Sequence, residues 1–137
     1  MGALRFSVGV FVLLVCVLLP LAASAQWFGS ARQLTTGEEI YVHICRSCHM
    51  PEGRGASSGV VTAPRLANDA RLGAPAYPIM VILNGKTGMP WFNGTLSPQQ
   101  IALVTNYIRT HFGNSFTDTV TEEDVRKLAG PVPRVER

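Results

Sequence analysis

The sequence predicts a small all-α domain, with three to five short helices joined by long loops. Three observations lead to this fold class. Helix-start signals precede several stretches in which apolar residues recur every three or four positions. Alternating strand-like patterns are few. Segments rich in proline and glycine, which favour loops, separate the helical stretches.

The first 25 residues of the 137-residue chain are typical of an export signal. Arg5 gives a short basic start, residues 8–19 are almost entirely apolar, and Ala23 and Ala25 form the small-residue pattern that signal peptidase accepts. We therefore expect cleavage after Ala25 and a periplasmic location. The apolar run is shorter than the ~20 residues of a spanning helix. Membrane attachment is expected only if the segment stays uncleaved.

The first helix is expected over residues 36–47. Thr35 or Thr36 can cap it, and Glu38 and Glu39 place negative charge in the first turn, where the helix dipole favours it. Residues at four-residue spacing form one ridge along this helix: Gly37, Tyr41, Cys45 and His49.

Residues 50–69 have neither helical nor strand periodicity, so they are expected to form a loop. A loop of this length in a small domain is usually disordered or wrapped around something. Residues 74–88 follow with early prolines, a compact apolar centre and an Asn84-Gly85 stop signal. This pattern predicts a helix of two to three turns, with a strand as the competing interpretation.

Residues 96–114 carry the clearest helix signal in the chain. Ser97 can cap the helix, Pro98 suits its first position, Gln100 completes a capping box and Gly113 stops it. Its apolar stripe consists of Ile101, Val104, Tyr107 and Ile108. A last short helix is expected from Glu122 to Ala129, between a Thr121 cap and Gly130, and the tail beyond it is expected to be loose.

Charge and size restrict the function. The 12 basic residues barely exceed the 9 acidic ones and form no run, so a nucleic-acid surface is not expected. A domain this small has a thin hydrophobic core and is expected to need a covalent staple or a cofactor. After removal of the signal only Cys45 and Cys48 remain to supply a disulfide.

The stretch Cys45-Arg-Ser-Cys48-His49 can be interpreted in three ways. A thiol redox pair or disulfide would use only the two cysteines, and redox pairs usually belong to a βαβ context that is lacking here. A zinc site would need four ligands, and neither His43 nor His111 has paired ligand spacing. The third interpretation, a c-type haem attachment site, uses all three residues, because two cysteines three apart can bind two vinyl groups while the histidine faces the iron.

With this motif the chain resembles class I c-type cytochromes over residues 36–112. The family places a glycine and an aromatic residue where Gly37 and Tyr41 stand, and an aliphatic and an aromatic residue at Val104 and Tyr107. The resemblance implies a cytochrome c-like fold around one haem c, bound covalently through Cys45 and Cys48. It also implies that Gly37 and Tyr41 cross the last core helix.

The family resemblance further implies a His/Met iron site, with His49 as one ligand. Met50 follows His49 too closely to reach the opposite haem face, and Met80 lies in an apolar segment where a core role is expected. Met89, in the Gly-Met-Pro-x-Phe pattern of residues 88–92, matches the family's distal ligand loop. His43 and His111 remain as alternative ligands and are otherwise expected on the surface. Two further residues match haem contacts: Pro64, whose carbonyl would accept the His49 Nδ1 proton, and Leu66.

These features predict an electron-transfer protein rather than an enzyme. Residues 26–35 would form a lead, 36–112 the cytochrome domain and 113–137 a C-terminal extension. The protein would be a free shuttle or the cytochrome subunit of a periplasmic dehydrogenase, with an oxidase or another cytochrome as acceptor. Two alternatives remain: a haem enzyme or gas sensor with a labile distal ligand, and a thiol redox protein without haem.

Overall fold

The computed structural model describes residues 33–57 and 62–132. These residues form helices and loops, and the only strand-like pairing among them consists of isolated bridges between loop residues, so the all-α prediction is confirmed. Within the described ranges, no helix is long and apolar enough to span a bilayer. The predicted export signal and its cleavage site lie outside the described residues.

The first helix is continuous over three segments, α2 (Gly37–Ile40), the π-helical η2 (Tyr41–Cys45) and α3 (Arg46–His49). Thr36 is its N-cap and forms a capping box with Glu39, which confirms the predicted helix start. The predicted end at residue 47 is wrong, because the helix continues to His49. It stops there because Met50 adopts a positive φ of 65°.

The π-helical turn interrupts the regular four-residue ridge that the sequence predicts. The amide of Arg46 donates to the carbonyl of Tyr41, five residues back, so one extra residue is accommodated between Tyr41 and the cysteine motif. Such turns occur mostly as single-turn bulges and are frequent at functional sites. Here the turn rotates the cysteine–histidine motif relative to the first part of the helix.

The middle of the chain forms a 3-10 turn, η3 (Ala70–Gly73), and then α4 (Ala76–Asn84). The strand interpretation of this segment is therefore wrong and the predicted helix is confirmed. Gly85 ends α4 with a φ of 70°, in the region that favours glycine.

Helix α5 (Pro98–Thr110) has the predicted Ser97 cap, with Gln100 completing the capping box. It ends earlier than predicted, before His111 rather than at Gly113. The physical reason is Asn114, whose side-chain amide donates to the carbonyl of Ile108 at 2.8 Å and so replaces a bond that a further helical turn would supply.

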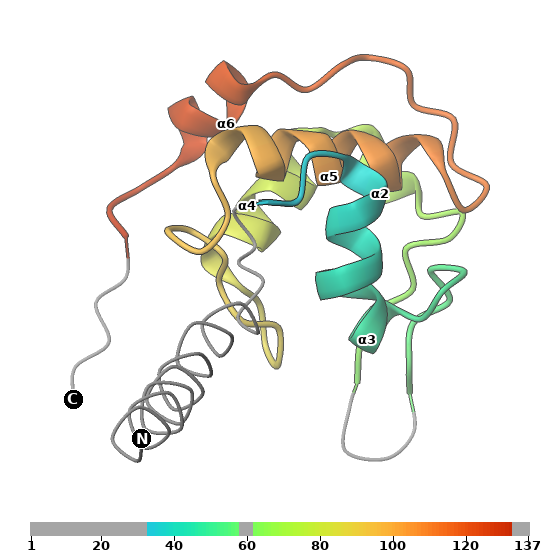
Figure 1. Ribbon diagram of the computed structural model, residues 1–137. Coiled ribbons are helices and arrows are strands. Elements are labelled where there is room, and N and C mark those ends of the chain that lie inside the picture. Colours follow the sequence, from blue (N-terminus) through green and yellow to red (C-terminus); the bar gives the residue numbers. More distant parts are fainter. Residues whose placement is uncertain (1–32, 58–61, 133–137) are drawn as a thin grey trace, which may run out of the picture. The chain divides into compact units, whose positions relative to one another are not determined.

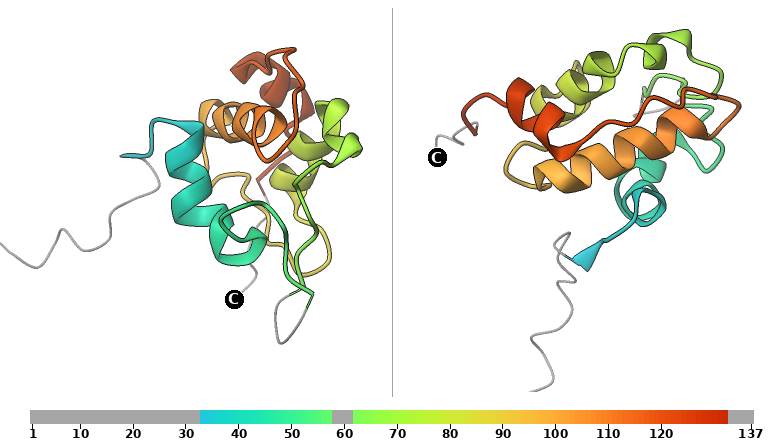
Figure 2. Two further views of the ribbon diagram at one scale, coloured as in Figure 1. Left: turned by 90° about the vertical axis from the view of Figure 1, so that its right-hand side faces the viewer. Right: turned by 90° about the horizontal axis from the view of Figure 1, so that it is seen from above.

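The chain after α5 turns back along that helix and forms α6 (Glu122–Leu128), as Figure 1 shows. In the right-hand view of Figure 2 this return segment runs beside α5 on the side of α4. Val120 and Val125 are buried in the core, and α6 contacts both α4 and α5. The C-terminal segment, defined here as residues 113–132, is therefore part of the packed domain.

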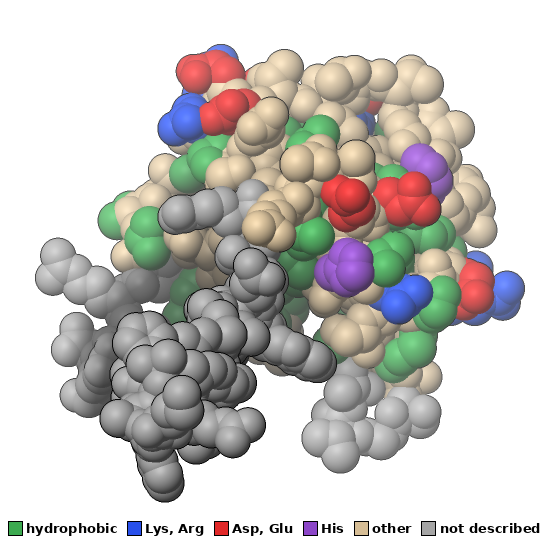
Figure 3. All heavy atoms as spheres, in the orientation of Figure 1, with side chains coloured by type: hydrophobic (Ala, Val, Ile, Leu, Met, Phe, Trp, Pro, Cys, Tyr) green, Lys and Arg blue, Asp and Glu red, His purple; other side chains and the backbone are tan. Residues whose placement is uncertain are grey.

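On its other side α5 is crossed by α2. A Cβ at Gly37 would overlap the carbonyl oxygen of Leu103 and lie 2.7 Å from the Cβ of Tyr107. The Tyr41 ring is 1% exposed and packs between Tyr107 and Phe112, with centroid separations of 5.6 and 4.8 Å. The predicted crossing is confirmed. Acidic and histidine side chains gather on the solvent face over α2 (Figure 3).

Candidate functional site

Cys45 and Cys48 lie at the end of the first helix as free, half-exposed thiols. Cys45 packs against the hydrophobic core, and burial raises the pKa of its thiol to about 12. Cysteines that exchange disulfides need the opposite shift, because the thiolate is the reactive form. The environment of Cys45 therefore does not favour it as the reactive thiol of a redox pair.

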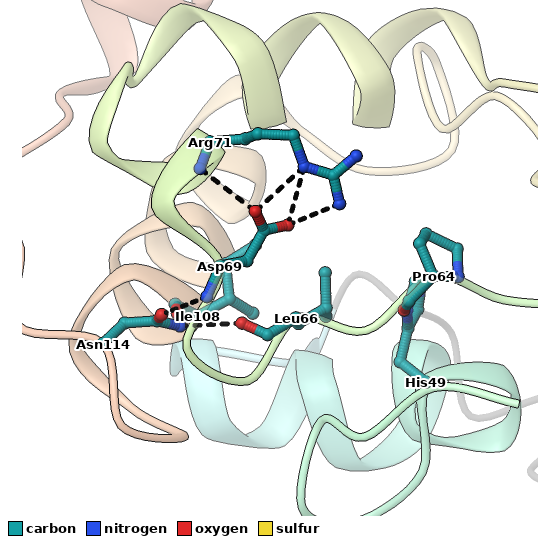
Figure 4. Close-up of polar contacts among 7 residues, drawn as sticks. All are labelled: His49, Pro64, Leu66, Asp69, Arg71, Ile108 and Asn114. Atoms are coloured by element: carbon teal, nitrogen blue, oxygen red, sulfur yellow. Dashed lines mark hydrogen bonds and ion pairs between the residues drawn. The ribbon is translucent and has the colours of Figure 1, made fainter.

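His49 is the buried residue of the motif, with 7% of its surface exposed. Its Nδ1 lies 2.9 Å from the carbonyl oxygen of Pro64, and in Figure 4 the ring points from the helix end toward that loop. Burial lowers the pKa of the imidazole and favours its neutral form. Neutral His49 then donates from Nδ1, which leaves Nε2 unprotonated, and no hydrogen-bond partner of Nε2 is found among the described residues.

The loop that presents Pro64 is held by backbone contacts that the sequence analysis missed. Gly55 donates its amide to the carbonyl of His49, and at its φ of 73° a Cβ would lie 2.7 Å from the carbonyl carbon of Pro64. Ala56 and Ala63 pair through two backbone hydrogen bonds of 3.0 and 2.8 Å. A glycine is thus required where the two arms of the loop meet, although nothing in the local pattern distinguishes it from an ordinary turn glycine.

Leu66 is half-buried and packs against the core. Its carbonyl accepts from the side chain of Asn114 at 2.9 Å, and the same side chain accepts the amide of Asp69 at 3.0 Å (Figure 4). Asn114 is 8% exposed. Because its side chain also binds the carbonyl of Ile108, it fixes this loop to the end of α5. No spacing or motif identifies it in the sequence, because the two loop residues that it binds lie more than 40 residues away.

Met89 is half-buried, packs against the same core and sits at the end of a tight turn. Its amide and carbonyl each bond to the backbone of Lys86, at 3.0 and 3.1 Å. Met80 is exposed by 43%, so the core role expected for it is wrong. His43 and His111 are exposed, as expected of surface residues.

These residues fit a covalently attached haem. Two free thiols one helical turn apart match two vinyl groups. The adjacent imidazole is neutral, and its Nε2 has no hydrogen-bond partner among the described residues. The Met89 thioether, on a separate turn held by backbone hydrogen bonds, would be a softer type of ligand than imidazole.

Comparison with known proteins gives the same picture. The family described as "Cytochrome C oxidase, cbb3-type, subunit III" matches residues 32–108. The chain is 31% identical over 86 residues to cytochrome c6 of Limnospira maxima, which covers 55% of this chain and 89% of the relative.

Longer relatives are also similar. The gluconate 2-dehydrogenase cytochrome c subunit of Pantoea cypripedii is 34% identical over 117 residues, covering 77% of this chain and 26% of the relative. The quinone-type alcohol dehydrogenase cytochrome c subunit of Gluconobacter oxydans is 34% identical over 107 residues, with coverages of 70% and 22%. The chain thus spans about a quarter of the length of these dehydrogenase subunits.

Proposed function

The chain belongs to the family of the cbb3-type cytochrome c oxidase subunit III domain and is a monohaem c-type cytochrome of class I fold, and from this premise we propose how its residues carry electrons. It is an electron-transfer protein with a covalently attached haem c, which supplies a one-electron Fe(II)/Fe(III) couple when bound. We further propose which residues form its site and which classes of protein donate and accept its electron.

We assign covalent attachment to Cys45 and Cys48 and iron ligation to His49 and Met89. The observation that carries this assignment is the hydrogen bond from buried His49 to the Pro64 carbonyl, 2.9 Å long. It fixes the ring orientation and tautomer, so that Nε2 is the nitrogen free to ligate. Leu66 is assigned as an apolar haem contact.

Met89 completes the site because its turn is anchored and its thioether is a soft ligand that favours the reduced iron. If His49 and Met89 both held the haem iron, they would leave it no open position for oxygen or peroxide. Electron transfer is then the chemistry that the site supports, and a gas sensor or haem enzyme would require Met89 to leave.

Absorption spectra and peptide mass analysis of the exported protein test the site. We expect a haem mass on the peptide that contains Cys45 and Cys48, and a weak near-infrared sulfur-to-iron band in the ferric protein at neutral pH. Met89→Ala should abolish that band, whereas Met80→Ala, at an exposed methionine, should keep it. A wild-type protein without the band would contradict the Met89 assignment and favour the sensor alternative.

The partner is proposed from the relatives' names. Several are cytochrome subunits of gluconate, alcohol or fructose dehydrogenases, and others are cytochrome c6. We propose that the electron donor is a periplasmic dehydrogenase and the acceptor an oxidase or another cytochrome. Purification from the native source separates the two modes: a co-purifying catalytic subunit indicates a dedicated subunit, and a pigmented monomer indicates a free shuttle.

Location and domain limits are part of the same proposal. Export would be followed by cleavage after Ala25, leaving a lead over residues 26–35, the cytochrome domain over 36–112 and an extension over 113–137. Amino-terminal sequencing of the pigmented periplasmic protein tests this, and a first residue other than Gln26 would move the cleavage site.

A further inference from the structure

The C-terminal segment returns to the loop that follows Met89. The side-chain amide of Asn93 donates to the carbonyl of Gly130 at 3.0 Å and lies 3.5 Å from that of Pro131. Next to it, a Cβ at Gly94 would lie 2.6 Å from the Cγ1 atom of Val132. The end of the segment therefore contacts this loop through two neighbouring residues.

The other end of the segment is fixed to α5. The guanidinium of Arg109, which is fully buried, binds both the backbone carbonyl and the carboxylate of Asp118. Asn106 exchanges two hydrogen bonds of 2.8 Å with the backbone of Val120. Because these anchors sit on the central helix, the tail residues that reach Asn93 are attached to a rigid element.

The Met89 loop, defined here as residues 85–97 between α4 and α5, is also attached to α4. The amide of Phe92 donates to the carbonyl of Ile82 at 2.9 Å, and the amide of Asn93 donates to that of Leu83 at 3.3 Å. Asn93 is thus the residue at which the loop is held by α4 through its backbone and by the C-terminal segment through its side chain. Met89 itself is four residues away.

We propose that Asn93 is a positioning residue, which holds the Met89 loop against the C-terminal segment and so favours the arrangement with the sulfur on the iron. This inference rests on the proposed function, because it takes Met89 as a ligand. In this proposal the loop exchanges between two states, one with Met89 in place and one with it withdrawn, and the bond from Asn93 to Gly130 forms only in the first. A hydrogen bond present only in the first state shifts the equilibrium toward it.

Competition by free imidazole measures this equilibrium in the full-length ferric holoprotein. Imidazole binds the iron only when Met89 is withdrawn, so its apparent Kd is inversely related to the withdrawn fraction. Asn93→Ala should lower the apparent Kd about three- to fivefold, the effect of losing one hydrogen bond of ordinary strength. Asn93→Asp, which removes the donor but keeps the shape, should act in the same direction.

Two asparagine variants serve as matched controls. Asn106→Ala removes two of the segment's bonds to α5 without touching the loop, and Asn84→Ala removes an amide-to-carbonyl bond within α4. Both should keep the imidazole Kd within about twofold of wild type, and thermal unfolding confirms that each variant is folded. The reduction potential should fall in the Asn93 variants only, since the withdrawn state loses the thioether ligand.

The outcomes separate the inference from the proposed function. If Met89→Ala tightens imidazole binding strongly but Asn93→Ala does not, the role of Asn93 is wrong and the ligand assignment stands. An equal effect of Asn106→Ala would likewise overturn the role of Asn93, since general loosening would then suffice. If Met89→Ala leaves imidazole binding unchanged, Met89 is not the ligand, and both proposals fall together.

Discussion

Helix α5 is packed on two sides in two different ways. On one side α2 crosses it through Gly37 and the buried ring of Tyr41, with backbone and aromatic surfaces in direct contact. On the other side the C-terminal segment buries Val120 and Val125 and is also bonded to α5 through three polar side chains, those of Arg109, Asn106 and Asn114. The first interface depends on shape, and the second depends in addition on single side chains that bind backbone groups.

This difference decides how each interface responds to change. A crossing that relies on the absence of a side chain cannot accept one, because the neighbouring backbone does not yield. A polar attachment can be weakened in steps, because each hydrogen bond contributes about 1 kcal/mol. The predictions below test that distinction, beginning with the largest expected effect.

The crossing is broken most directly by Gly37→Val. The new side chain would overlap the Leu103 carbonyl, and we expect the free energy of unfolding to fall by about 3 kcal/mol or more. Urea unfolding of the holoprotein measures this. Gly130→Ala is the control, because a Cβ there meets nothing within 4 Å, and it should change stability by less than about 0.5 kcal/mol. Equal tolerance of both substitutions would contradict the shape argument.

The polar interface is tested by Arg109→Met. This change removes the bonds from the guanidinium to Asp118 in the C-terminal segment and leaves the Leu72 carbonyl, 2.8 Å from Nε, without its partner. We expect a loss of about 2–3 kcal/mol in the same unfolding assay. Arg71→Met is the matched control, since Arg71 pairs with Asp69 at an exposed position. The control should lose less than about 1 kcal/mol. A control loss as large as that of Arg109→Met would show that burial of the arginine does not determine the loss of stability.

Tyr41→Phe tests the aromatic contact and its pH dependence. The phenol donates to the Met50 carbonyl at 2.6 Å, and its removal should cost about 1–1.5 kcal/mol at neutral pH. Burial raises the pKa of Tyr41 to about 12, against ~10 in the unfolded chain. The unfolded state therefore loses this proton first, and wild type should lose stability as the pH rises from about 10 to 12. The variant should lose less over that range, and an equal loss in the variant and the wild type would contradict the role of the Tyr41 phenol.

The smallest expected effect is a gain. The hydroxyl of Thr105 in α5 is fully buried and has no hydrogen-bond partner among the described residues. Thr105→Val replaces it with a methyl group of similar size and should stabilise the protein by about 0.5–1 kcal/mol. The exposed Thr110 hydroxyl, which donates to the Asn106 carbonyl, offers the comparison. Thr110→Val should give no gain in thermal unfolding, and a loss at Thr105 would indicate an unrecognised partner for its hydroxyl.

The sequence by itself determined the helix starts, and the family resemblance carried by Gly37 and Tyr41 predicted the α2–α5 crossing. Capping residues act on the next three amides, and Gly37 and Tyr41 stand four residues apart, so both signals are local in the chain. The cysteine–histidine motif is local as well, and the family match agrees with it. Physical effects that operate within one or two helical turns leave a readable pattern.

Only the tertiary structure decided the remainder. It extended the first helix to His49 through a π turn, ended α5 early at Thr110 and exposed Met80, whose local surroundings in the sequence are apolar. It also brought Asn93 to Gly130 and Arg109 to Leu72, each across 37 residues. A side chain that satisfies a backbone group so far away needs no particular spacing or neighbours. Its role is therefore set by the packing that brings the two segments together.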